Sequence, residues 1–121
     1  MILTPIRWTQ TVVIPTEAGG ASLSPGYDVG GGAKDIGVIM PAVWVAAAVS
    51  YQVSADGVTY VNLYTENATE VTSAVAQGLT QSLNTTAPHL SQWRYIKVRS
   101  GATAAHVDQT AARTLTFIFE R

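Results

Sequence analysis

Residues 45–64 read VAAAVSYQVSADGVTYVNLY, and this stretch decides the fold class. Larger and smaller side chains alternate up to residue 54, with the period of two that is typical of a β-strand. Asp56 and Gly57 then supply a residue that tolerates the left-handed conformation followed by glycine, and the alternation resumes at residues 59–64. The stretch therefore predicts a β-hairpin built from residues 44–54 and 59–64.

The same alternation recurs along the rest of the chain. Ile6, Trp8, Val12 and Ile14 share one face of the first such run, and Pro15 ends it. For residues 69–81 a helix is the less favoured alternative to strands, because threonines and a glycine lower the helix propensity of this segment. We predict an all-β fold, an antiparallel β-sandwich of the jelly-roll type with about eight strands. The predicted strands are residues 6–14, 35–43, 44–54, 59–64, 93–100 and 114–121, with weaker ones at 70–77 and 79–83.

Length and composition narrow the class of protein. The chain has 121 residues, which fits a single domain over residues 1–121. Charged residues make up 12% of it, about half the usual share, so serine, threonine, asparagine and glutamine must supply much of the surface polarity. Such a surface is easily desolvated by a protein partner. A net charge of −1 argues against a nucleic-acid partner, and no apolar run is long enough to predict a membrane span.

Residues 15–34 form a glycine-rich segment that we predict to be a contact loop. They hold six of the ten glycines and two of the five prolines. A loop of this length is uncommon in a compact domain unless it has a function. We expect its apolar side chains, together with one near the N-terminus, to contact a partner: Leu3, Leu23, Tyr27 and Val29.

The sequence motifs that could indicate a catalytic, metal or phosphate-binding site are weak. The two histidines, His89 and His106, lack the ligand spacing of a zinc site, and there is no cysteine. His106, Asp108 and a serine match a catalytic triad in composition only, because no nucleophile elbow is present. The glycine cluster before Lys34 lacks the serine or threonine of a phosphate loop. We therefore predict no catalytic, cofactor or metal site, and we expect a protein that is not an enzyme.

Two further groups of residues leave alternatives open. The basic residues Arg94, Lys97, Arg99 and Arg113 could form a weak anion-binding patch. The favoured alternatives are edge charges that stop strands from pairing with other chains, or buried-edge partners for carboxylates. The three tryptophans and five tyrosines either fill the core and subunit contacts, which is the favoured alternative, or include a platform for stacking sugars.

Three segments carry a resemblance to a known family: AAVSYQVSADGVTY at residues 47–60, WRYIKVRSG at 93–101 and DQTAARTL at 108–115. They are similar to small jelly-roll structural proteins of tailed bacteriophages, which include head decoration or cement proteins and related fibre domains. The likeness covers about residues 35–121. It implies the jelly-roll architecture and a role in the virion, and it implies no catalytic residues.

The resemblance implies a non-enzymatic capsid decoration or cement subunit that binds and stabilises the phage head shell. Its partner would be the major capsid protein or another virion protein, on the capsid surface after assembly in the bacterial host cytoplasm. We expect a homo-oligomer, with a trimer favoured by threefold shell positions. The alternative is a carbohydrate- or receptor-binding module of a phage tail fibre or other appendage.

Overall fold

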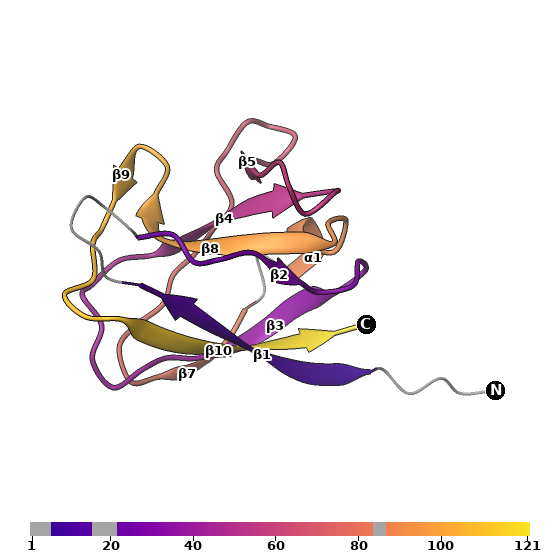
Figure 1. Cartoon of the computed structure of the whole chain (residues 1–121). Helices are drawn as coiled ribbons and strands as arrows, with labels where there is room; N and C mark the ends of the chain where they lie inside the picture. The colour runs from indigo at the N-terminus through magenta and orange to yellow at the C-terminus, as the bar shows by residue number, and fades with distance from the viewer. Residues whose placement is uncertain (1–5, 16–21, 84–86) are drawn as a thin grey trace.

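Two antiparallel β-sheets form the two layers of the structure (Figure 1). The computed structural model describes residues 6–15, 22–83 and 87–121. Leu3 and residues 16–21 of the predicted contact loop lie outside the described residues. Within the described residues the elements are β1 (Arg7–Ile14), β2 (Tyr27–Asp28), β3 (Lys34–Ile39), β4 (Val49–Ser54), β5 (Val61–Asn62), β6 (Thr72–Ser73), β7 (Thr80–Ser82), α1 (Ala87–Leu90), β8 (Tyr95–Ala102), β9 (Ala105–His106) and β10 (Arg113–Glu120).

The strands are divided between the sheets as follows. The first sheet has the order β1-β10-β3-β7, and the second has the order β2-β8-β4-β5. The short strands β6 and β9 pair with β4 and β8 at the margins of the second sheet. These pairings are antiparallel, so the predicted all-β, antiparallel sandwich is confirmed.

The core lies between the sheets and is built from the alternate residues that the sequence pattern singles out. Leu115, Phe117 and Phe119 point inward from β10 and are fully buried. Tyr51, on β4 of the other sheet, meets Phe117 edge-on with ring centroids 6.5 Å apart. Val49 and Val53 flank Tyr51 on the same face of β4. Edge-to-face packing is a favourable aromatic geometry, so this contact helps to hold the two layers together.

The hairpin predicted around Gly57 is confirmed. β4 and β5 pair with Val53 opposite Val61, and Gly57 has a φ of 78°, which glycine adopts without strain. The Ser54 hydroxyl accepts a hydrogen bond from the Gly57 amide at 2.9 Å and donates one to Asp56 Oδ1 at 2.9 Å. The second strand, β5, is shorter than expected, since it spans Val61–Asn62.

The strand predicted for residues 44–54 begins only at Val49, so the prediction for residues 44–48 is wrong. Trp44 is 5% exposed, and its indole N–H donates to the Ala47 carbonyl at 3.1 Å. Its backbone N–H donates to Gln77 Oε1 at 3.2 Å. The segment therefore bends to bury a large ring in the core instead of extending the ladder.

Two other boundaries differ from the predictions. The strand expected over residues 35–43 ends at Ile39, shortly before Pro41, which cannot donate to a ladder. The glycine-rich segment is not a loop throughout, because β2 joins the second sheet and Leu23 forms an isolated bridge with Arg99.

Candidate functional site

The outer surface of the first sheet carries a regular array of side chains from four strands. In an antiparallel ladder, directly opposed residues lie on the same face of the sheet. Thr11 stands opposite Thr116, Thr116 opposite Ile39, and Ile39 opposite Thr80, so one row crosses all four strands. The uncharged residues on this outer surface, which we call the threonine face, are Thr9, Thr11 and Val13 of β1, Thr114, Thr116 and Ile118 of β10, Gly37 and Ile39 of β3, and Thr80 and Ser82 of β7.

The threonine face presents hydroxyls and methyl groups to the outside. Ile39 is 44% exposed and Val13 is 37% exposed. Within the residues that the structure describes, none of the hydroxyls on this face has a hydrogen-bond partner. The charged residues of this outer surface, Arg7, Glu120 and Lys34, stand opposite one another at one end, where Arg7 Nε and Glu120 Oε2 form an ion pair at 2.7 Å. The face therefore combines free hydrogen-bonding groups with very little charge.

The outer surface of the second sheet is organised differently, because its polar groups bind one another. Arg99 is 8% exposed and donates to Asn62 Oδ1 at 2.9 Å, to Thr103 Oγ1 at 2.9 Å and to Ser50 Oγ at 3.3 Å. Its guanidinium also lies 3.9 Å from a Glu70 carboxylate oxygen. Glu70 in turn accepts a hydrogen bond from the Thr103 amide. Arg99 is thus a structural partner for a carboxylate, as one of the sequence-based alternatives proposed.

The other predicted basic residues also have partners. Arg94 pairs with Asp28 at 3.0 Å, and this hydrogen-bonded guanidinium lowers the pKa of the Asp28 carboxyl. Lys97 Nζ lies 4.4 Å from the centroid of the Tyr60 ring. Arg113 is buried and donates to Gln109 and Thr110. Each of the four cations therefore has a partner within the subunit, and the Arg94 side chain is 57% exposed.

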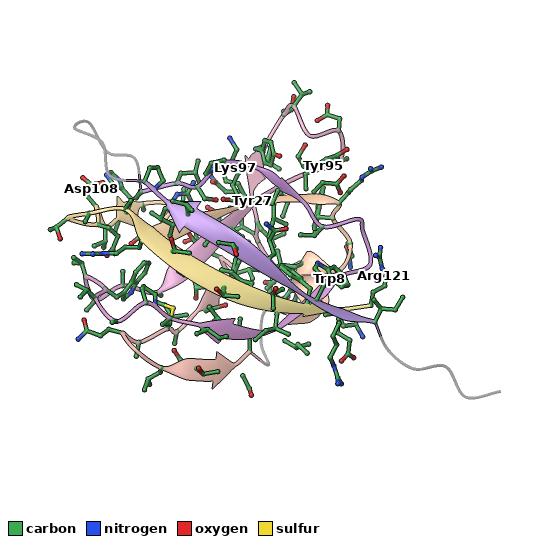
Figure 2. All side chains as sticks on the ribbon, turned by 60° about the horizontal axis from the view of Figure 1, so that its bottom comes forward. Trp8, Tyr27, Tyr95, Lys97, Asp108 and Arg121 are labelled. Atoms are coloured by element: carbon green, nitrogen blue, oxygen red, sulfur yellow. The ribbon has the colours of Figure 1, made fainter. Side chains whose placement is uncertain are left out.

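The candidate partner contacts occupy three different environments. Val29 is 3% exposed and belongs to the core, so its side chain is committed to packing inside the subunit. Tyr27 is partly buried against the core, and its hydroxyl accepts a hydrogen bond from the Val13 amide at 3.0 Å. Figure 2 places Tyr27 beside β1. Leu23 is half-buried. Contact of Leu23 and Tyr27 with a partner stays a prediction.

The aromatic residues divide between core and surface. Trp44 and Tyr51 are buried in the core, as the favoured alternative predicts. Trp8 stacks on Phe119 with ring centroids 5.8 Å apart, and the Arg121 guanidinium lies 5.1 Å from the Trp8 ring (Figure 2). Tyr64, by contrast, is 47% exposed and lines a cleft with Trp93.

The residues considered for catalysis stand in open positions. His106 Nε2 and Asp108 Oδ1 are 3.8 Å apart, beyond hydrogen-bond distance, and both side chains are more than half exposed. Across the described residues, no group of three histidine or acidic side chains is arranged to hold a metal ion. No helix in the described ranges has the length and apolar character needed to cross a membrane.

Sequence reasoning missed the threonine face as a single surface. The signal was present in β1 and β10, because threonines recur with a period of two at Thr9 and Thr11 and again at Thr114 and Thr116. What could not be read from the chain was that β10 lies between β1 and β3, which brings these separate stripes together.

Comparison of the chain with protein-family models, with curated proteins and with solved structures finds no match. The functional argument therefore rests on the residues and on the two surfaces described above.

Proposed function

We propose that this chain is a non-enzymatic structural subunit of a bacteriophage virion, a capsid decoration or cement protein that docks on the head shell. The observation that carries the proposal is the threonine face, a wide, nearly uncharged surface whose hydroxyls have no partner among the described residues. The partner would be the major capsid protein or another virion protein with an equally uncharged polar surface.

The physical chemistry of the threonine face suits a protein partner. A hydroxyl both donates and accepts, so it can match either kind of backbone group on a facing surface. It is also far cheaper to desolvate than a charged side chain. Threonine and isoleucine are branched at Cβ and already restricted in χ1, so they lose little side-chain freedom when covered. Attachment through this face should therefore depend only weakly on salt.

The strand order supports the jelly-roll part of the proposal. With the two-residue margin strands β6 and β9 set aside, eight of the strands in the described ranges remain, four in each sheet. The chain passes from one sheet to the other at each step except between β4 and β5, which form the hairpin. Eight antiparallel strands wound as two Greek keys define a jelly roll. This architecture accords with the resemblance to phage head proteins noted in the sequence.

Oligomer formation is part of the same proposal. A homo-oligomer with closed symmetry, and a trimer in particular, would match threefold positions of a shell. Light scattering of the purified protein measures this directly. A trimer mass supports the assignment, and a strict monomer both in solution and on particles would contradict it.

The docking test uses two charges placed on the threonine face. In the double variant Thr11→Lys and Thr80→Lys, both positions are exposed and lie in the same cross-strand row. We expect occupancy on purified head shells to fall about tenfold or more, since two ammonium groups would be desolvated without partners. Thr72→Lys, at an exposed position on β6 of the other sheet, is the matched control and should leave occupancy unchanged.

Circular dichroism and thermal unfolding establish that the double variant is folded before occupancy is compared. A folded double variant that occupies shells as well as the parent protein would overturn docking through the threonine face. Loss of occupancy in both the double variant and the Thr72 control would overturn it as well, because binding would then follow net charge instead of this surface.

A further inference from the structure

A cleft of about 810 Å³ lies outside the threonine face, between the segment 63–69 and the segment 89–93. We call it the hairpin cleft. Its volume falls in the range of small-molecule sites, roughly 300–1,000 Å³. The side chains that give it its chemistry are Tyr64, Glu66, Asn67, His89, Gln92 and Trp93.

One wall of the hairpin cleft is a tightly closed turn. The Thr65 amide donates to the Thr69 carbonyl at 2.8 Å, and the Ala68 amide donates to the Thr65 carbonyl at 2.9 Å. Ala68 adopts a left-handed conformation with a φ of 60°, which is uncommon for a residue with a Cβ. The turn holds Glu66 and Asn67 at its exposed tip. The polar groups of this wall are therefore displayed on a hydrogen-bonded frame.

The opposite wall is fixed to the core. Leu90, the last residue of α1, is fully buried, and its carbonyl accepts a hydrogen bond from the Trp93 amide at 3.1 Å. The Trp93 ring is partly buried against the core cluster. Leu63, which also lines the cleft, is 6% exposed. One face of the site is thus a preorganised aromatic surface, which lowers the entropic cost of binding.

The composition of the lining selects the class of ligand. Two aromatic rings offer flat apolar surfaces, while Asn67 and Gln92 each carry both a donor and an acceptor. Among the described residues that line the cleft there is no lysine or arginine, which argues against an anionic ligand, and Glu66 is the one carboxylate among them. The site therefore favours a neutral molecule that has apolar C–H faces and a rim of hydroxyl groups.

We propose that the hairpin cleft binds a neutral saccharide. The C–H face of a sugar ring packs against both Tyr64 and Trp93, and the side-chain amides and Glu66 bind its hydroxyls. This inference deepens the carbohydrate-binding alternative raised by the sequence, and it does not depend on the capsid role, because the threonine face contributes no residue to the cleft.

The binding test is a titration of the full chain, labelled with ¹⁵N, followed by NMR. The probes are neutral oligosaccharides built from glucose, from galactose and from N-acetylglucosamine. We expect at least one probe to shift the amide signals of residues 63–69 and 89–93, with a weak dissociation constant of about 0.1–10 mM. If no probe in the panel shifts these signals, or if shifts occur only elsewhere, the proposal is overturned.

Two variants of the cleft distinguish the contribution of ring stacking to saccharide binding from the contribution of charge. Tyr64→Ala removes an exposed ring and should weaken saccharide binding about tenfold, whereas Ile39→Ala, at a similarly exposed position on the threonine face, should leave it unchanged. Glu66→Gln keeps the hydrogen-bonding shape without the charge and should retain binding within about threefold. A trimethyl-lysine peptide serves as the cationic probe, since aromatic residues beside a carboxylate can also hold a quaternary ammonium.

The proposal would be overturned in favour of a cation site by one combination of results. The trimethyl-lysine peptide would bind tightly, this binding would be lost in Glu66→Gln, and no saccharide would bind. Saccharide binding that is indifferent to Tyr64→Ala would overturn the assignment to this cleft. Neither result bears on shell occupancy, so failure of this inference and failure of the capsid role remain distinguishable.

Discussion

Asp56 illustrates how a single side chain can fix a turn. Its Oδ1 accepts hydrogen bonds from the amides of Val58 at 2.9 Å and Thr59 at 3.0 Å and from the Ser54 hydroxyl at 2.9 Å. The amide hydrogen bonds from Thr59 and Val58, followed by the Ser54 hydroxyl, lower the pKa of the Asp56 carboxyl from 3.8 to about 2. The ionised form is therefore the one that the folded hairpin stabilises.

The pH dependence follows from the direction of this shift. Because the pKa of Asp56 is lower in the folded state, its contribution to stability is complete above pH 3.8 and disappears as the pH falls toward 2. We expect NMR titration of the Asp56 carboxyl to give a midpoint near pH 2. The stability difference between the parent protein and Asp56→Asn should vanish over the same interval. A midpoint near 3.8 would show that these hydrogen bonds are not maintained in solution.

At the scale of the element, β8 combines strand pairing with a sharp reversal. Gly101, near its end, has a φ of 92°. Its amide donates to the Ala48 carbonyl at 2.7 Å, and its carbonyl accepts from the Ser50 hydroxyl at 2.6 Å. A Cβ at this position would lie 2.6 Å from the Ala105 carbonyl oxygen and 2.6 Å from the Val107 amide nitrogen. Both atoms belong to the backbone, so neither can move aside easily.

We expect Gly101→Ala to lower the free energy of unfolding by about 2–5 kcal/mol, because steric overlap adds to the cost of a left-handed alanine. Gly78→Ala is the matched control. Gly78 has a φ of 71° with no atom within 4 Å of its added Cβ, so only the conformational penalty of about 1–2 kcal/mol should remain. Urea unfolding measures both values. Equal losses in the two variants would contradict the steric argument.

The elements differ in how far the sequence predicts them. β10 was predicted to within one residue at each end, because Leu115, Phe117 and Phe119 alternate without interruption and all three are buried. Residues 44–48 follow the same pattern yet leave the ladder, since Trp44 is held in the core through Gln77, which is remote in the sequence. Alternation reports which side chains prefer burial, but it does not report which distant residue will bind them.

The candidate surfaces were less predictable for the same reason. Each threonine stripe is visible along its own strand, but the threonine face exists only because four strands, remote in sequence, are neighbours. The hairpin cleft likewise joins residues 63–69 to residues 89–93. The basic residues 94–99 form one run in the sequence, and the structure separates them among Asp28, Tyr60 and Glu70.

At the scale of the whole molecule, a buried polar link joins the two sheets. The Tyr51 hydroxyl on β4 donates to Asp35 Oδ2 on β3 at 3.2 Å. The same hydroxyl shares a hydrogen bond with Ser73 Oγ on β6 at 2.8 Å. Asp35, Tyr51 and Ser73 are all buried, so water cannot readily replace a lost partner. The link therefore favours one alignment of the two layers.

Replacement of Tyr51 by phenylalanine keeps the ring and removes the link. We expect Tyr51→Phe to destabilise the protein by about 1–3 kcal/mol, because a buried carboxylate oxygen loses a donor. Tyr27→Phe should lower the free energy of unfolding by less than about 0.5 kcal/mol. The Val13 amide then loses the Tyr27 hydroxyl as its acceptor, but it is at an exposed position where water can bind. Calorimetry of both variants measures these losses of stability. A Tyr51→Phe loss as small as that of Tyr27→Phe would contradict the stabilising role.

The pairing of β1 with β10 has a consequence for how the protein is made. Arg7 pairs with Glu120, 113 residues later, and Ile14 pairs with Arg113. Within the described chain, β10 is the only strand that pairs with β1. At about 5–20 residues per second, the ribosome delivers β10 roughly 5–20 s after β1. The apolar side of β1 stays unpaired through that interval, so the first sheet closes only after β10 has been synthesised, and chaperones have time to bind β1 before its partner emerges.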